Sequence, residues 1–115
     1  MKTNLSFFLL TILFACTPAE KSVQNWFKGN LHTHSYWSDG DDYPEMVMDW
    51  YKSNGYDFVS LSEHNIIAQG EKWKLIPKSP LHEEAFQNYL EKYGEDWVNY
   101  KEDTGRISVK LKTLN

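Results

Sequence analysis

A strand–helix–strand pattern between residues 29 and 61 constrains the fold of this chain most strongly. Residues 44–53 begin with a proline, carry Glu45 in the first turn and are followed by Gly55, features that together predict a helix. An extended segment precedes this helix, and residues 56–61 are expected to form a second strand. A strand, a helix and a strand within about thirty residues form a right-handed βαβ unit, whose strands are parallel and end on one side. The predicted fold class is therefore α/β.

Potential metal ligands follow the ends of both predicted strands. His32 and His34 alternate along the first strand, so their imidazoles are expected on the same side, about 6.5 to 7 Å apart. Asp39 follows in a Ser-Asp-Gly turn, where its carboxylate can fold back over the same edge. Glu63 and His64 follow the second strand. Because nitrogen and oxygen donors meet at one edge, the sequence predicts a metal site that suits Zn, Mn or Fe.

These two motifs resemble those of the PHP (polymerase and histidinol phosphatase) family. Residues 29–40 read GNLHTHSYWSDG and are similar to the first family motif; residues 59–65 read VSLSEHN and are similar to the second, which usually contains Asp-His. The resemblance implies a distorted (β/α)7 barrel that binds two or three divalent metal ions and hydrolyses phosphate esters with a metal-held hydroxide.

The resemblance also implies roles for individual residues. By position, His32, His34, Asp39 and His64 correspond to family metal ligands. Glu63 stands where the family usually has Asp, and it is expected beside the ligands, orienting one of them or a bound water. No residue is assigned as a general acid. The remaining histidine, His82, is expected on the surface of a helix that Ser79 caps and Pro80 begins.

Chain length bears on how much of such a barrel is present. A (β/α) barrel typically needs about 250 residues, whereas this sequence has 115. The later family motifs supply a bridging Glu, further His residues and a final Asp-x-His, none of which can be matched here. Residues 26–115 are therefore expected to form the N-terminal, incomplete part of the domain, and four donors from two loops are not expected to close a multinuclear site.

The first fifteen residues are predicted to be a secretory signal peptide. Lys2 is a basic head, and the apolar run that ends at residue 15 is shorter than the ~20 residues that span a bilayer. Residues 13–16 resemble the lipobox of bacterial lipoproteins, which predicts lipidation of Cys16 and a tether over residues 16–25. The predicted location is the periplasmic or surface side of a bacterial membrane, with a lipid anchor. A plain secreted or uncleaved chain is the alternative.

Charge favours a small-molecule partner over nucleic acid. The formal net charge is −4, whereas binding to a nucleic-acid backbone depends on clustered Lys and Arg. Bound metal cations would still attract a phosphorylated small-molecule substrate at short range. Two alternatives remain: an amidohydrolase-like barrel, which also opens with His-x-His but attacks amides or lactones, and an exported lipoprotein with a degenerate barrel that only binds metal or glycans. Trp37 lies in the motif loop, where it is expected to wall the substrate pocket.

Local patterns are weaker in the rest of the chain. Residues 66–79 are expected to form a loop. Residues 81–100 carry an apolar stripe at helical spacing that includes Trp97, so an amphipathic helix or a broken pair interrupted at Gly94 is predicted. Residues 107–111 alternate like a strand, although they are also compatible with the start of a helix.

Overall fold

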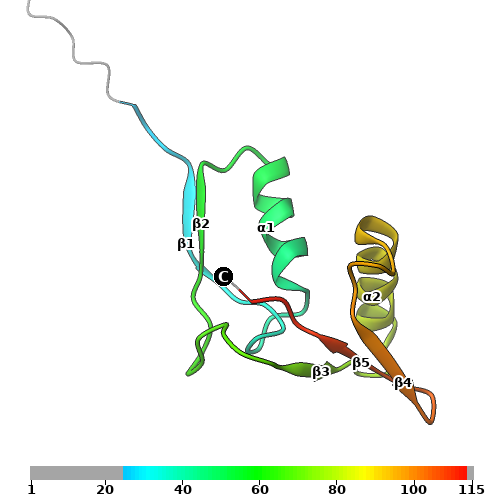
Figure 1. Ribbon diagram of the computed structural model, residues 1–115. Helices are drawn as coiled ribbons and strands as arrows, with labels where there is room; N and C mark the ends of the chain where they lie inside the picture. The colour runs from blue at the N-terminus through cyan, green and yellow to red at the C-terminus, as the bar shows by residue number, and fades with distance from the viewer. Residues whose placement is uncertain (1–24, 114–115) are drawn as a thin grey trace, which may run out of the picture.

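The computed structural model describes residues 25–113, so the predicted signal peptide, Cys16 and the tether up to residue 24 lie outside the described residues. The described part is a small mixed α/β fold with two separate sheets, which agrees with the predicted class (Figure 1). The barrel stays a prediction. In chain order the elements are β1 (Gly29–Thr33), α1 (Pro44–Ser53), β2 (Phe58–Leu61), β3 (Trp73–Leu75), α2 (Pro80–Tyr93), β4 (Tyr100–Asp103) and β5 (Arg106–Lys110).

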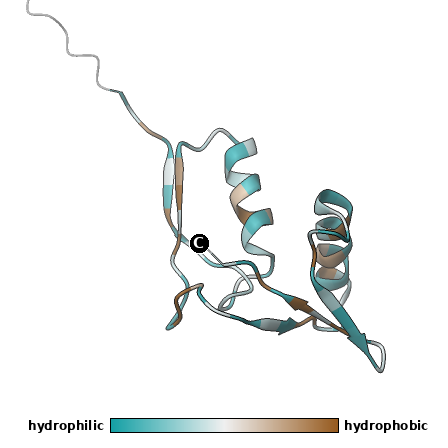
Figure 2. Cartoon of the chain, viewed as in Figure 1, coloured by the Kyte–Doolittle hydropathy of each residue, from teal (hydrophilic) through white to brown (hydrophobic). Residues whose placement is uncertain are grey.

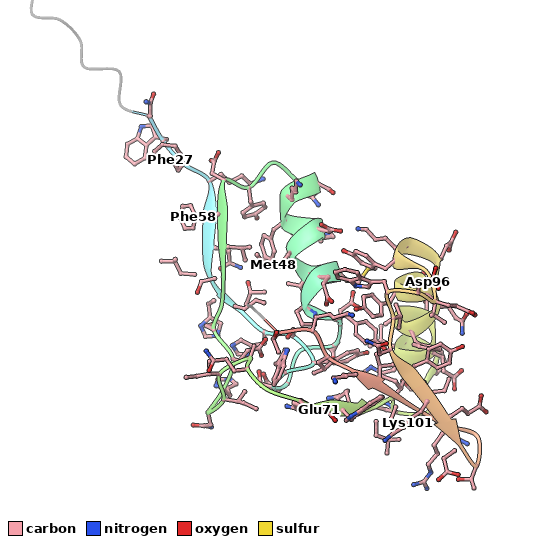
Figure 3. All side chains as sticks on the ribbon, in the orientation of Figure 1. Phe27, Met48, Phe58, Glu71, Asp96 and Lys101 are labelled. Atoms are coloured by element: carbon pink, nitrogen blue, oxygen red, sulfur yellow. The ribbon has the colours of Figure 1, made fainter. Side chains whose placement is uncertain are left out.

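The strand–helix–strand prediction is confirmed. β1 and β2 are parallel neighbours, with Gly29 opposite Phe58, and α1 covers one face of the pair (Figure 1). The opposite face is open, because Leu31 and Phe58 are exposed. Phe27 and Phe58 project from this open side, away from α1 (Figure 3). One face of the parallel pair is thus packed and the other lacks a covering layer within the described residues.

Helix α1 has the bounds that the sequence predicts. Pro44 occupies the first position, where its missing N–H costs no hydrogen bond, and Glu45 places negative charge in the first turn. Gly55 follows the helix with φ of 69°, a left-handed conformation that glycine adopts without strain. The chain then turns directly into β2.

Two predictions for the second half of the chain are wrong. Residues 73–75 are not loop but the strand β3, which pairs antiparallel with β5. The interruption predicted at Gly94 is confirmed, since α2 ends at Tyr93 and Gly94 has a φ of 79°, but the prediction of helical structure up to residue 100 is wrong. Residues 100–103 instead form β4, which pairs antiparallel with β5 in the sheet order β3-β5-β4. The predicted strand near residues 107–111 is confirmed as β5.

Helix α2 begins as predicted and lies against the antiparallel sheet. The Ser79 hydroxyl accepts the backbone N–H of His82 at 3.5 Å, and Pro80 is the first helical residue. The Phe86 ring meets the Tyr100 ring of β4 edge to face, with centroids 5.3 Å apart. Among residues 25–113, neither helix has the length and apolar character needed to cross a membrane.

The hydrophobic core joins the loop after β1 to α2 and the antiparallel sheet. Hydrophobic residues are visible on β2 and β5, whereas β4 is mostly hydrophilic (Figure 2). Trp37 is only 1% exposed and its indole N–H donates to the Lys112 carbonyl at 2.8 Å, so the expectation that it walls a pocket is wrong. Trp97, expected on a packed helical stripe, lies beyond α2 and is exposed. The buried core residues are Tyr36, Trp37, Tyr43, Ala68, Ile76, Phe86, Tyr89, Val98, Val109 and Leu111.

Candidate metal centre

The candidate site lies where the two parallel strands end. The β1–β2 register slips between Asn30 and Thr33, where β1 carries one more residue than β2. Both of these side chains consequently reach the hydroxyl of Tyr51 on α1. Bulges of this kind redirect side chains and are frequent beside functional sites. His32 and His34, on either side of Thr33, have ring centroids 4.8 Å apart, so their imidazoles lie together as expected.

Three of the four predicted donors converge at this edge. His34 Nδ1 lies 2.7 Å from Asp39 Oδ1, and His64 Nε2 lies 3.6 Å from Asp39 Oδ2. One donor atom from each of these residues lies within 4.8 Å of the other two. The His34 and His64 rings meet edge to face, with centroids 4.3 Å apart. Residues from the ends of both strands therefore meet as the βαβ topology requires.

His32 is adjacent to this group but is not part of it. Its ring contacts that of His34, while the three-donor group consists of His34, Asp39 and His64. The His32 backbone N–H donates to the Asn30 side-chain oxygen at 3.0 Å, which fixes the bulged strand. The structure therefore places His32 against His34 but outside the three-donor group.

The three-donor group could hold a divalent metal ion if its donor atoms moved closer together. Donors bound tetrahedrally at ordinary metal–ligand lengths lie about 3.3 Å apart. The present spacing of up to 4.8 Å can close, because the side chains of Asp39 and His64 are 64% and 56% exposed. The His34 side chain is only 15% exposed, and its Nε2 atom is buried without a hydrogen-bond partner among the described residues. A ligand on Nε2 would remove that unsatisfied group, while Asp39 holds Nδ1.

Hydrogen bonding favours the ionised form of Asp39. Desolvation raises the pKa of this carboxyl, but hydrogen bonds with His34 and Ser38 and the charges of the two histidines lower it by more. The net pKa therefore lies below its usual value. An ionised carboxylate beside two imidazoles is the donor set that Zn, Mn and Fe accept.

Glu63 acts on the loop that carries the ligands. Its carboxylate accepts the backbone N–H of Ser35 at 3.0 Å and also accepts the hydroxyls of Ser35 and Ser38. Glu63 thereby holds the segment between His34 and Asp39 against the end of β2. The sequence placed Glu63 beside the ligands, but it gave no role to the two serines, whose only signal is their position within the motif.

Two backbone positions shape the same edge. A Cβ atom added at Gly40 would lie 2.5 Å from the carbonyl carbon and oxygen of His34, so the turn approaches the ligand backbone closely enough to require glycine. Asn65 has a φ of 54°, a left-handed conformation that asparagine tolerates better than most residues. These two positions fix the backbone beside His34 and His64.

His82 lies in a different environment from the three-donor group. Its Nδ1 atom hydrogen-bonds the hydroxyl of buried Tyr36 at 2.8 Å. Burial raises the pKa of Tyr36 to about 12, with Asp42 and Asp41 adding to the effect. The Tyr36 hydroxyl is therefore neutral, and His82 joins α2 to the motif loop.

A cavity of about 350 Å³ opens beside His34. Three carboxylates contribute to its wall, so an anionic ligand would be repelled unless a cation offsets their charge. Its lining residues are His34, Asp41, Asp42, Val47, Leu81, Glu84, Ala85 and Asn88.

Comparison with protein-family models, with curated proteins and with solved structures finds no match to this chain. The class that the described residues define is thus a mixed α/β protein with a three-residue His/Asp cluster at the carboxyl ends of two parallel strands.

Proposed function

We propose that this chain contributes the first metal ligands of a PHP-type, metal-dependent phosphoesterase. The observation that carries the proposal is the convergence of His34, Asp39 and His64 at the ends of β1 and β2. The order and spacing of the two motifs support the family assignment. The open face at Leu31 and Phe58 supports the finer fold, a distorted (β/α)7 barrel, because further strands would cover it.

Each residue of the cluster has a separate proposed role in such a site. A divalent Zn, Mn or Fe ion bound there would supply a water of lowered pKa and positive charge against the phosphate oxygens. His34 and His64 offer imidazole nitrogens, and Asp39 offers an oxygen donor or orients His34. Glu63 holds the loop between His34 and Asp39 in place. His32, which lies against His34, is the proposed ligand of a further ion. A phosphorylated small molecule is the proposed substrate, whose approach past Asp41, Asp42 and Glu84 depends on the bound cation.

Metal-loaded protein and matched histidine variants test this function. The chain is purified, equilibrated with Zn²⁺, Mn²⁺ or Fe²⁺, and measured for metal content and for hydrolysis of p-nitrophenyl phosphate. We expect stoichiometric metal that is lost in His34→Ala and in His64→Ala, and we expect metal-dependent hydrolysis only where the remaining family ligands complete the site. The control is His82→Ala, which removes a histidine outside the cluster and is expected to retain the metal. Absence of metal from the unaltered protein, or equal metal in His34→Ala, would overturn the proposal.

A metal-binding protein without hydrolytic activity is the second candidate. The three carboxylates beside His34 favour it, because they attract cations and repel phosphate esters. Stoichiometric, His34-dependent metal without phosphate ester hydrolysis, in a protein that also carries the remaining family ligands, would favour this candidate over the phosphoesterase.

We also propose that the protein is exported and anchored by a lipid on Cys16. The support is the apolar leader that ends at residue 15 and the lipobox-like residues before the cysteine. Mass spectrometry of the protein expressed in bacteria is expected to show an acylated N-terminal Cys16, and Cys16→Ser is expected to abolish the added mass. A Cys16 without lipid would exclude the anchor.

A further inference from the structure

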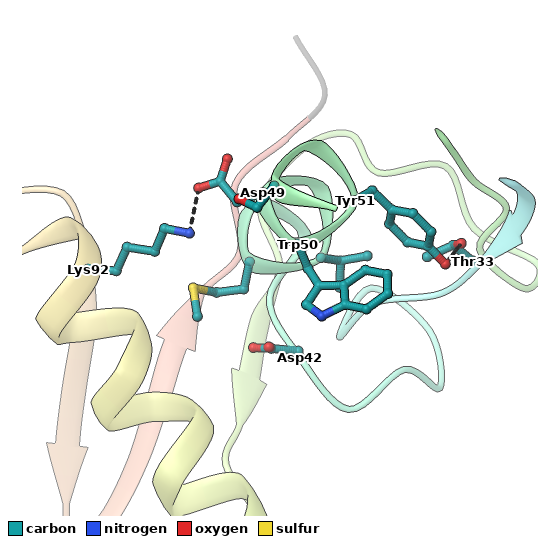
Figure 4. Close-up of a pocket in the computed structure, with 9 residues that line it drawn as sticks. Thr33, Asp42, Asp49, Trp50, Tyr51 and Lys92 are labelled. Carbon is teal, nitrogen blue, oxygen red and sulfur yellow. Dashed lines mark hydrogen bonds and ion pairs between the residues drawn. The ribbon is translucent and has the colours of Figure 1, made fainter. Parts of the chain in front are cut away.

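A second cavity, of about 450 Å³, lies between α1 and α2 on the helical side of the parallel strands (Figure 4). Its size falls within the usual range for small-molecule sites, about 300 to 1,000 Å³. None of the three clustered metal-site residues lines it. The lining residues are Thr33, Asp42, Met46, Val47, Asp49, Trp50, Tyr51, Ser53 and Lys92.

The charges around this cavity are unbalanced. Lys92 Nζ lies 2.9 Å from Asp49 Oδ2, the contact drawn in Figure 4, and the Tyr93 hydroxyl also donates to Asp49. Asp49 is therefore neutralised by its neighbours. Asp42 accepts the backbone N–H of Tyr43 at 2.8 Å, and no side-chain cation pairs with it among the described residues. One carboxylate in the wall thus lacks a counterion.

Because Asp42 is partly buried, its ionised form is unfavourable without a counterion. Desolvation raises the pKa of its carboxyl despite the Tyr43 hydrogen bond and the charge of Lys92. A cationic group that entered the cavity would stabilise the ionised form. An ammonium group is therefore a suitable partner for the Asp42 carboxylate, because it supplies both positive charge and hydrogen-bond donors.

An aromatic and apolar wall accompanies this carboxylate. Trp50 is 57% exposed although it lines the cavity, and the Tyr51 ring meets it edge to face at a centroid distance of 5.1 Å. The indole ring of tryptophan is the strongest side-chain partner for a cation over its face. Met46 and Val47 add a flexible thioether and a small apolar surface.

We propose that the cavity between α1 and α2 binds an organic ammonium ion with an apolar or aromatic body. The ammonium group lies on Asp42, and the body packs against Trp50 and Met46. The Lys92–Asp49 pair closes one side of the cavity and contributes no free charge. This binding site uses none of the three clustered donors, although Asp42 and Val47 also line the cavity beside His34.

Titration of the full chain with phenethylammonium tests the site. Two-dimensional NMR follows the indole N–H resonances, and the Trp50 signal is assigned from Trp50→Phe. We expect a saturable shift of Trp50 and no shift of Trp73, which is exposed on the other sheet. The uncharged 2-phenylethanol has a similar shape and is expected to bind at least about tenfold more weakly, because it lacks the charge.

Charge variants separate specific binding from general attraction. Asp42→Asn is expected to weaken phenethylammonium binding about tenfold, whereas Lys92→Met is expected to tighten it up to about fivefold, because it frees the carboxylate of Asp49 that Lys92 neutralises. Glu71→Gln, which alters an exposed carboxylate paired with Lys110 elsewhere, is the control and is expected to change nothing. Equal binding of the alcohol, a linear Trp50 shift, or an equal effect of Glu71→Gln and Asp42→Asn would overturn the proposal.

Discussion

Ser35 donates both its backbone N–H and its hydroxyl to the carboxylate of Glu63, twenty-eight residues further along the chain. This contact joins the residue after His34 to the residue before His64. The two strand ends that carry the candidate ligands are therefore connected by a charge-assisted hydrogen-bond network. Positioning of this kind is what orients metal ligands in proteins.

Glu63→Gln is expected to weaken this hydrogen-bond network without changing the size of the side chain. The amide keeps one acceptor but loses the charge, which is expected to cost about 1 to 3 kcal/mol of unfolding free energy. Metal affinity is expected to fall about tenfold to one-hundredfold, as for other residues that orient ligands. Urea unfolding and metal titration measure the two effects. Glu71→Gln serves as the control, and an unchanged metal affinity in Glu63→Gln would show that Glu63 acts on stability alone.

Gly40→Ala is expected to damage the site through a steric clash. The new methyl group would lie 2.5 Å from the His34 backbone, which cannot move aside as a flexible side chain can. Crowding of this kind costs about 1 to 3 kcal/mol, and the displaced His34 is expected to bind metal less tightly. Gly70→Ala is the matched control, since Gly70 has a φ of 75° but no neighbour within 4 Å. Gly70→Ala is expected to lower stability through backbone strain while leaving metal affinity unchanged.

The fold shows why the sequence predicts its first half better than its second. Helix α1 and the parallel strands arise from local signals, namely Pro44, Glu45 and Gly55, and a βαβ unit has few alternatives. The antiparallel sheet depends on pairing between β3 and β5, about thirty-five residues apart, which local periodicity does not encode. Thr104 and Gly105 form a two-residue hairpin turn with positive φ at both positions. In the sequence, Gly105 is a partial indication of this turn.

The sequence predicted the three donors that lie together, but it also placed His32 among them and did not predict the residues that support the cluster. The motif spacing brings His34, Asp39 and His64 to one edge because parallel strands end together. The burial of Trp37 was not predictable, since its partners come from distant residues such as Lys112. The contact between Glu63 and Ser35 was not predictable for the same reason, because the two residues are far apart in the sequence.

The backbone at Asn65 gives a prediction that concerns His64. Its φ of 54° is a conformation that β-branched residues avoid. Asn65→Val is expected to cost about 1 to 2 kcal/mol and to shift the neighbouring His64, with weaker metal binding. Asn65→Gly is expected to stay within about 1 kcal/mol of the unaltered protein and to keep its metal affinity. Similar losses of stability in both variants would mean that the asparagine side chain, rather than its backbone conformation, matters.

Asp42→Asn is expected to stabilise the protein near neutral pH. Burial raises the pKa of Asp42 in the folded state, so folding favours its protonated form. The ionised carboxylate therefore destabilises the fold above its folded-state pKa, and this penalty disappears below the unfolded pKa of about 3.9. The advantage of Asp42→Asn is expected to be present near neutral pH and absent below about pH 4. Urea unfolding as a function of pH measures it.

Asp49→Asn is the matched variant across the same cavity, and its effect has the opposite sign. The Tyr93 and Lys92 hydrogen bonds lower the pKa of Asp49, so its ionised form stabilises the folded state. That contribution is present above the unfolded pKa of about 3.9 and is lost as the pH falls through the folded-state value. Asp49→Asn is therefore expected to destabilise near neutral pH and to have no effect in strong acid. Because both variants remove one negative charge, a shared sign would mean that net charge governs stability and that the local environments of the two carboxyls do not.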